Sequence, residues 1–134
     1  MLKTNDYQEL LNIAYAGVIA QGGPSIDEDD TCLYKSPNGR RCAASLCLTD
    51  EAFEYAAEFE ENSAHGTSID KLAAEYGRDH PDEDDLGGAM LEFLGDLQTA
   101  HDELQYWNSE DWPKQWDRGI KQLAKRYNIT MPAK

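Results

Sequence analysis

The scarcity of β-branched residues is the feature of this sequence that most restricts its fold. Valine occurs once and isoleucine six times in 134 residues, whereas leucine occurs 13 times and alanine 15 times. Valine and isoleucine suit a pleated sheet, while leucine and alanine lose little freedom in a helix. The composition therefore excludes a sandwich or barrel of strands and predicts a mainly α fold.

Aromatic residues separate this chain from disordered ones. Leu, Ile, Val and Phe together make up 23 of 134 residues and the net charge is −14, a combination that is typical of disorder. Seven tyrosines, three tryptophans and three phenylalanines oppose that interpretation, because disordered segments are poor in aromatic residues. Since a chain of this length corresponds to one domain, we expect a single folded domain over residues 1–134.

Five segments repeat apolar residues at spacings of three and four, the period of an α-helix. The expected helices are a first helix over about 5–21, a short helix from Asp50, a second short helix over about 67–77, a long helix over about 83–107 and a last helix from Trp112. We expect the long helix to be central, with the others packed around it. Glycines at 87, 88 and 95 weaken it by about 1 kcal/mol each relative to alanine, so we expect close helix crossings at these positions.

One segment has the pattern of a β-hairpin. Residues 32–35 and 40–42 flank Ser36-Pro37-Asn38-Gly39, where the proline and the glycine suit a type I turn. A small hairpin is therefore expected, which makes α+β the alternative fold class. It would place Cys32 and Cys42 together as small buried residues at its base.

The cysteines do not have the spacing of a metal site. Intervals of ten residues from Cys32 to Cys42 and five from Cys42 to Cys47 differ from the paired ligands, two to four residues apart, of structural zinc sites. We expect no metal and no cofactor. The odd number of cysteines, and the absence of a signal-peptide core after Met1, predict a cytoplasmic protein with no membrane partner.

Acidic residues are concentrated in the middle of the chain. Eighteen acidic residues stand against Lys71 and Arg78 between Glu51 and Asp111, a local net charge of 2 − 18 = −16. Such a field opposes direct nucleic-acid binding, whereas rows of carboxylates on rigid helices can imitate a nucleic acid and occupy the basic groove of a protein. Solubility and helix capping are the alternative explanation. The candidate partner-binding carboxylates are Glu54, Glu58, Glu61, Asp82, Glu83, Asp84 and Asp85.

Two further features accompany this acid. Tyr106, Trp107, Trp112 and Trp116 crowd a short segment, in which the helical period turns the tryptophans inward and leaves Tyr106 as the exposed candidate for partner binding. The last helix also carries a basic stripe opposite its aromatic one, which we interpret as a solvated face. This stripe consists of Lys114, Arg118, Lys121 and Lys125.

The pair His101-Asp102 is the one enzymatic alternative. It has the adjacent His-Asp of metal-dependent phosphohydrolases, with His80 and Asp117 as the available completions, but their intervals are too short for such a site. His101 also lies on the apolar stripe of the long helix, where we expect a buried structural histidine bonded to a backbone carbonyl or to the hairpin. Since no base, nucleophile and oxyanion donor occur together, the sequence predicts no catalytic residues.

Two segments carry a family resemblance. The hairpin, Cys32-Leu33-Tyr34-Lys35 through Gly39-Arg40-Arg41-Cys42-Ala43-Ala44, and the later Leu97-Gln98-Thr99-Ala100-His101-Asp102 resemble a family of small uncharacterised proteins from bacterial genomes, prophages and tailed phages. The resemblance brings no known activity. It implies a phage-encoded binding protein that inhibits a host defence or nucleic-acid-handling protein, with a structural or accessory phage protein as a further alternative.

Overall fold

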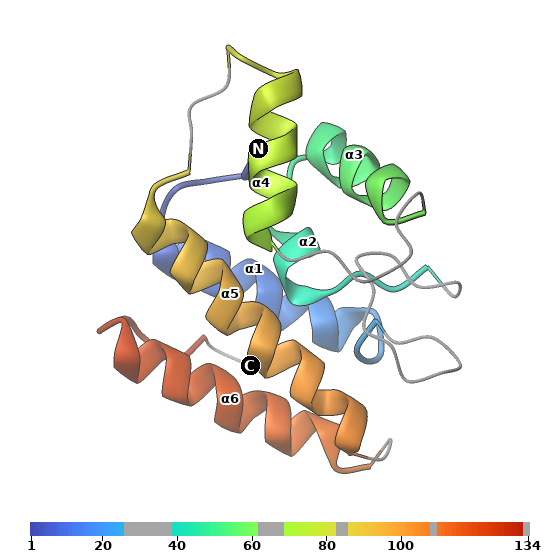
Figure 1. Ribbon diagram of the computed structural model, residues 1–134. Helices are drawn as coiled ribbons and strands as arrows, with labels where there is room; N and C mark the ends of the chain where they lie inside the picture. Colours follow the sequence, from blue (N-terminus) through green and yellow to red (C-terminus); the bar gives the residue numbers. More distant parts are fainter. Residues whose placement is uncertain (26–38, 62–68, 83–85, 108–109, 133–134) are drawn as a thin grey trace.

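The chain folds into helices throughout the part that the structure describes. The computed structural model describes residues 1–25, 39–61, 69–82, 86–107 and 110–132, without the side chains of residues 59–61. No strand occurs in these ranges, where an isolated bridge pairs Leu2 with Leu48, so the expected mainly α fold is confirmed. The helices are α1 (Tyr7–Ala20), α2 (Ala43–Leu46), α3 (Asp50–Glu61), α4 (Ile69–Asp79), α5 (Gly88–Asp102), the 3₁₀ helix η1 (Glu103–Tyr106) and α6 (Trp112–Arg126) (Figure 1).

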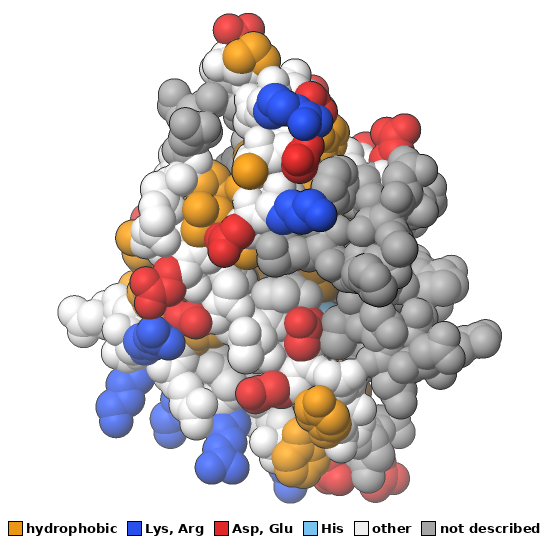
Figure 2. Space-filling model, viewed as in Figure 1, with side chains coloured by type: hydrophobic (Ala, Val, Ile, Leu, Met, Phe, Trp, Pro, Cys, Tyr) orange, Lys and Arg blue, Asp and Glu red, His pale blue; other side chains and the backbone are white. Residues whose placement is uncertain are grey.

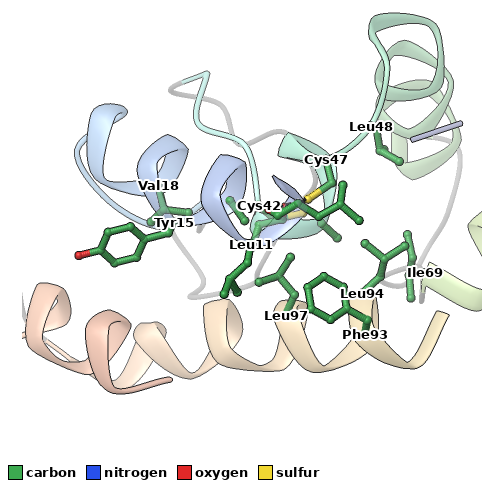
Figure 3. Close-up of a cluster of buried hydrophobic side chains, with 14 of the residues drawn as sticks. Leu11, Tyr15, Val18, Cys42, Cys47, Leu48, Ile69, Phe93, Leu94 and Leu97 are labelled. Carbon is green, nitrogen blue, oxygen red and sulfur yellow. Dashed lines mark hydrogen bonds between the residues drawn. The ribbon is translucent and has the colours of Figure 1, made fainter. Parts of the chain in front are cut away.

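Helix α5 lies in the middle of the molecule, as the sequence predicts. It packs against α2, α4 and α6, while α3 lies at the other side of α2 and α4 (Figure 1). The buried side of α5 faces α1 and α2, and Phe93, Leu94 and Leu97 point from it into the cluster that contains Leu11 (Figure 3). The side chains that α5 buries are Met90, Phe93, Leu94, Leu97 and His101.

Helix α1 begins and ends at clear sequence signals. The Asp6 side chain accepts the backbone N–H of Glu9, which satisfies one of the free donors of the first turn. At the other end Gly22 and Gly23 have φ values of 90° and 151°, and the Arg40 guanidinium lies only 2.8 Å from the place where a Gly23 Cβ would stand. The Gly-Gly stop therefore meets both a conformational and a spatial requirement.

The first and last helices meet although they are far apart in sequence. The Gln8 side chain donates to the Thr130 carbonyl and accepts the Thr130 N–H, each at 2.8 Å. The rings of Tyr7 and Tyr127 lie 5.8 Å apart, and the Trp116 indole N–H donates to the Tyr15 carbonyl at 3.2 Å. Helix α1 is thus held by the C-terminal segment along much of its length.

The predicted hairpin is not seen. Its first arm and most of its turn, residues 32–38, lie outside the described residues, as does Cys32. Its second arm leads directly into α2, with Cys42 as the N-cap whose sulfur accepts the Ser45 N–H at 3.4 Å. A helix forms directly after this arm because its first three residues, Ala43–Ser45, are buried between α1 and α5.

The expected reason for the glycines of the long helix is wrong. Among the described residues, no atom lies within 4 Å of the Cβ positions of Gly87, Gly88 and Gly95, so no described helix crosses closely there. Close approaches occur instead at Gly17, where a Cβ would stand 2.8 Å from Leu46, and at Gly119, 3.3 Å from Ala100. The close helix contacts are therefore α1 on α2 and α5 on α6.

The ends of α4 and α5 differ from the sequence expectation, whereas the end of α6 agrees with it. Helix α5 begins at Gly88 and gives way to η1 after Asp102, so it is shorter than predicted. Gly77 does not terminate α4, which continues to Asp79. Helix α6 closes near Asn128 as expected: this residue has φ 55°, and the Ile129 N–H reaches back to the Ala124 carbonyl at 2.9 Å.

None of the helices in the described ranges is both long enough and apolar enough to cross a lipid bilayer.

Candidate functional site

Helix α3 exposes a row of carboxylates because its other side is buried. Ala52, Phe53 and Ala56 pack into the core, while Glu54 and Glu58 stand exposed one helical turn apart. Residues at this spacing have Cβ atoms about 5–6 Å apart on a helix surface. Glu61 belongs to the same helix, but its side chain lies outside the described residues.

The second acidic cluster precedes α5. Asp82 is exposed, whereas Glu83, Asp84 and Asp85 lie outside the described residues. Because α5 begins at Gly88 with Gly87 as its N-cap, its first turn contains no acidic residue. The dipole of α5 therefore has no carboxylate within the first turn itself, where its effect is strongest.

Several other acidic residues form contacts within the molecule. Asp79 accepts the Tyr55 hydroxyl at 2.6 Å, which holds the pKa of that carboxyl below its usual value, and Glu75 pairs with Arg78 at 2.6 Å. Arg126 pairs with Glu92 at 3.0 Å and with Asp96 at 3.2 Å across the α5–α6 contact. Part of the acidic excess therefore stabilises helix packing.

Arg41 adds a positive charge beneath α3. Its guanidinium lies 3.6 Å from the centre of the Phe53 ring and donates to the Ser45 carbonyl, while its Nε is buried without a hydrogen-bond partner. Burial lowers the pKa of Arg41, and the nearby Asp50 and Glu54 oppose this effect. Glu54 is thus exposed to solvent and also compensates a half-buried cation.

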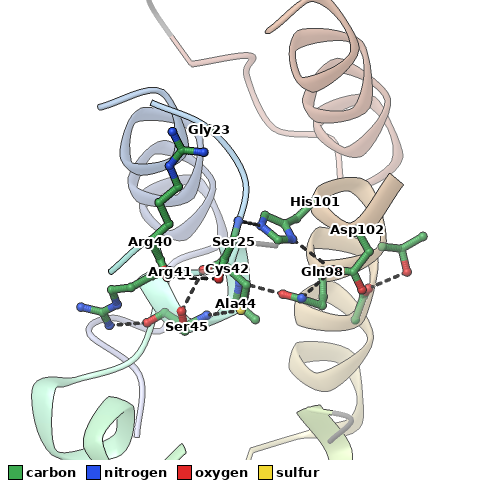
Figure 4. A network of polar contacts seen from close by, with 12 residues as sticks. Gly23, Ser25, Arg40, Arg41, Cys42, Ala44, Ser45, Gln98, His101 and Asp102 are labelled. Atoms are coloured by element: carbon green, nitrogen blue, oxygen red, sulfur yellow. Dashed lines mark hydrogen bonds and ion pairs between the residues drawn. The ribbon is translucent and has the colours of Figure 1, made fainter. Parts of the chain in front are cut away.

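The structure places His101 in the core. Its ring is fully buried, Nε2 accepts the Ser25 N–H at 2.9 Å, and Nδ1 lies 3.0 Å from an Asp102 carboxylate oxygen (Figure 4). This pattern fits a neutral ring with its proton on Nδ1. The expected bond to a backbone carbonyl or to the hairpin is therefore wrong, because the partner is the backbone amide of a residue that precedes the hairpin segment.

The same network connects α5 to α2. The Gln98 amide donates to Asp102 at 2.8 Å and accepts the Ala44 N–H at 3.2 Å (Figure 4). Both nitrogens of His101 are already hydrogen-bonded in this network, which favours the structural interpretation of the pair. Across the described residues, no group of three or more His, Cys, Asp or Glu side chains is arranged to hold a metal ion.

Exposed hydrophobic side chains gather near one end of α6. Tyr106 is 79% exposed, in agreement with the sequence, but Trp107, which the helical period turned inward, is 46% exposed, and Ile19 of α1 is 43% exposed. Trp107 escapes the expected stripe because α5 changes to η1 at Glu103 and the period is lost. Helix η1, which carries Tyr106, contacts α5 and α6, whereas α3 contacts α2 and α4. Since α3 and α6 lie on opposite sides of α5 in Figure 1, Tyr106 is not brought together with the carboxylates of α3.

The outer side of α6 is basic, as predicted. The four cations of the predicted stripe are all exposed, and a row of Lys and Arg side chains follows the lower edge of the molecule in Figure 2. On the same view the carboxylates are scattered over the rest of the surface. The cations of the stripe are Lys114, Arg118, Lys121 and Lys125.

Comparison of the chain with known protein families, with curated proteins and with solved structures finds no match.

Proposed function

We propose that this chain is a non-enzymatic protein-binding inhibitor whose partner carries a groove lined by Lys and Arg. The exposed carboxylates of α3 are the observation that supports it. Glu54 and Glu58 stand on a helix whose opposite side is anchored in the core, so their spacing is fixed. Fixed negative charges a few ångströms apart are what a groove shaped for nucleic acid recognises.

In this proposal the cluster before α5 adds to the acidic surface. Its one described member, Asp82, is exposed, and α5 has no acidic residue in its first turn. The acidic surface consists of Glu54, Glu58, Glu61, Asp82, Glu83, Asp84 and Asp85. Because the chain resembles proteins of prophages and tailed phages, we propose that it acts in the host cytoplasm on a host defence or nucleic-acid-handling protein.

Affinity capture from host lysate followed by charge reversal tests this function. Glu54→Lys with Glu58→Lys, and separately Asp82→Lys with Asp84→Lys and Asp85→Lys, should weaken the captured complex at least tenfold. The complex should also weaken as the salt concentration rises, because salt screens the attraction between the carboxylates and the basic groove. Duplex DNA should compete with the protein, because its phosphates bind the same groove.

The matched control reverses two exposed carboxylates away from α3. Glu9→Lys with Glu103→Lys changes the net charge by the same four units as the α3 variant. It should leave binding within about threefold of the unmodified protein. A complex that survives both reversals and is insensitive to salt would show that the acid serves solubility alone.

A further inference from the structure

A small hollow lies between η1 and the helices α5 and α6, which run side by side (Figure 1). Its volume is about 220 Å³, less than the roughly 300–1,000 Å³ of sites for drug-sized ligands, so it suits a single flat ring system. The two helices meet closely at one point of it, where a Cβ on Gly119 would stand 3.3 Å from Ala100. The described lining consists of Ala100, Glu103, Leu104, Trp107, Gln115, Arg118, Gly119 and Gln122.

An exposed tryptophan gives this hollow an aromatic wall. Trp107 directly follows η1, and 46% of it is exposed. Its backbone N–H donates to the Leu104 carbonyl at 3.1 Å, and Leu104 is itself buried, so the ring is attached to a fixed part of the fold. Exposed aromatic rings of this kind stack the flat faces of nucleobases.

Four polar side chains line the same hollow. Glu103 comes from η1, whereas Gln115, Arg118 and Gln122 come from α6 at spacings of three and four, and therefore from one face of that helix. Within the described ranges, these four side chains form no hydrogen bond or ion pair. A ligand therefore meets a carboxylate acceptor on the η1 side and guanidinium and amide donors on the α6 side.

We infer that this hollow binds a guanine base stacked on Trp107. Guanine presents two adjacent acceptors, O6 and N7, and beside them two adjacent donors, the N1 hydrogen and the 2-amino group. The fork of donors on Arg118 matches O6 and N7, and the carboxylate of Glu103 accepts from N1 and the 2-amino group. Adenine carries an amino donor in place of O6 and lacks the N1 hydrogen, so it offers both side chains the wrong partner. This inference is independent of the acidic surface on α3.

Three uncharged nucleosides test it, because a phosphate would also be attracted to the basic stripe of α6. Titration of the ¹⁵N-labelled protein with guanosine should give saturable shifts of the Trp107 indole signal and of the Gly119 amide signal. Inosine, which lacks the 2-amino group, should bind about tenfold more weakly, because one hydrogen bond to a charged group is lost. Adenosine should give no saturable shift at these signals. Equal binding of guanosine and adenosine, or no saturable shift with guanosine, would overturn the inference.

Two pairs of variants locate the binding in this hollow. Glu103→Gln should weaken guanosine binding about tenfold, because an amide replaces the accepting carboxylate, whereas Glu9→Gln removes the same charge from α1 and should change binding less than twofold. Trp107→Ala should abolish the guanosine shift of Gly119, whereas Tyr106→Ala, which removes the neighbouring exposed ring, should retain it. All four side chains are exposed, so these variants should fold. A guanosine shift of Gly119 that persists in Trp107→Ala, or equal effects of Glu103→Gln and Glu9→Gln, would contradict the proposed site.

Discussion

His101 shows how one buried polar side chain connects distant segments. Its ring accepts the amide of Ser25 from the segment after α1, and Asp102 orients the ring from the other side. A buried amide left without an acceptor costs about 1–3 kcal/mol. The segment after α1 is therefore connected to α5 through the single imidazole of His101.

Replacement of this histidine should destabilise the protein without loss of a metal. We expect His101→Ala to lower the free energy of unfolding by about 1–3 kcal/mol, because the Ser25 amide loses its acceptor and a cavity remains. Urea unfolding measures the change, and His80→Ala, a partly exposed position, is the comparison and should cost less. Stoichiometric zinc, manganese or iron in the unmodified protein that disappears in the variant would contradict the structural role.

Three tyrosine–aspartate bonds connect pairs of elements. Tyr15 of α1 donates to Asp117 of α6, Tyr55 of α3 donates to Asp79 of α4, and Tyr127 after α6 donates to Asp96 of α5, each at 2.6 Å. Burial and these aspartates raise the pKa of Tyr15 and of Tyr55 to about 12, and that of Tyr127 well above its ordinary value of 10.0.

These shifts predict alkaline destabilisation. The unfolded chain releases the tyrosine protons from about pH 10, whereas the folded protein keeps them until about pH 12, so the unfolded state is favoured increasingly as pH rises between these values. Below pH 10 the contribution is fully present. Urea unfolding at a series of alkaline pH values should show this decline, and it should be smaller in a variant with phenylalanine at 15, 55 and 127.

The glycines of α1 and α5 should respond oppositely to alanine. Gly95→Ala adds a Cβ in open space within α5, and we expect about 0.5–1 kcal/mol of stabilisation from helix propensity. Gly17→Ala places a Cβ 2.8 Å from Leu46, and the required repacking should outweigh the same propensity gain by about 1 kcal/mol. Thermal and urea unfolding of the two variants measures both signs, and stabilisation by Gly17→Ala would contradict the close contact.

The sequence predicts the long elements well because their periodicity and their stops are local signals. Helix α1 between Asp6 and the Gly-Gly stop, and α6 between Pro113 and Asn128, follow from such signals. Helix α2 does not, because its four residues are helical through tertiary burial. The bond between Tyr15 of α1 and Asp117 of α6 could not be predicted either, since the two residues are 102 positions apart and no local pattern relates them.

At the scale of the whole molecule, the packing predicts one cooperative unit. Helix α5 contacts elements on both sides, and α1 contacts both α2 and α6. We expect a helix-dominated circular dichroism spectrum and a single thermal transition that coincides with the one seen by tryptophan fluorescence. Two separated transitions would show that the chain is not a single domain.

The pairing of Gln8 with Thr130 has a consequence for synthesis of the chain. Helix α1 leaves the ribosome well before its partners Trp116, Tyr127 and Thr130, because Tyr15 and Trp116 are 101 positions apart and Gln8 and Thr130 are 122 positions apart. An apolar helix that must wait for such distant partners stays exposed to chaperones and proteases during that time. Yield in the cell should therefore depend on how quickly translation reaches α6, so slow codons placed before residue 112 should lower it even though the finished protein is unchanged.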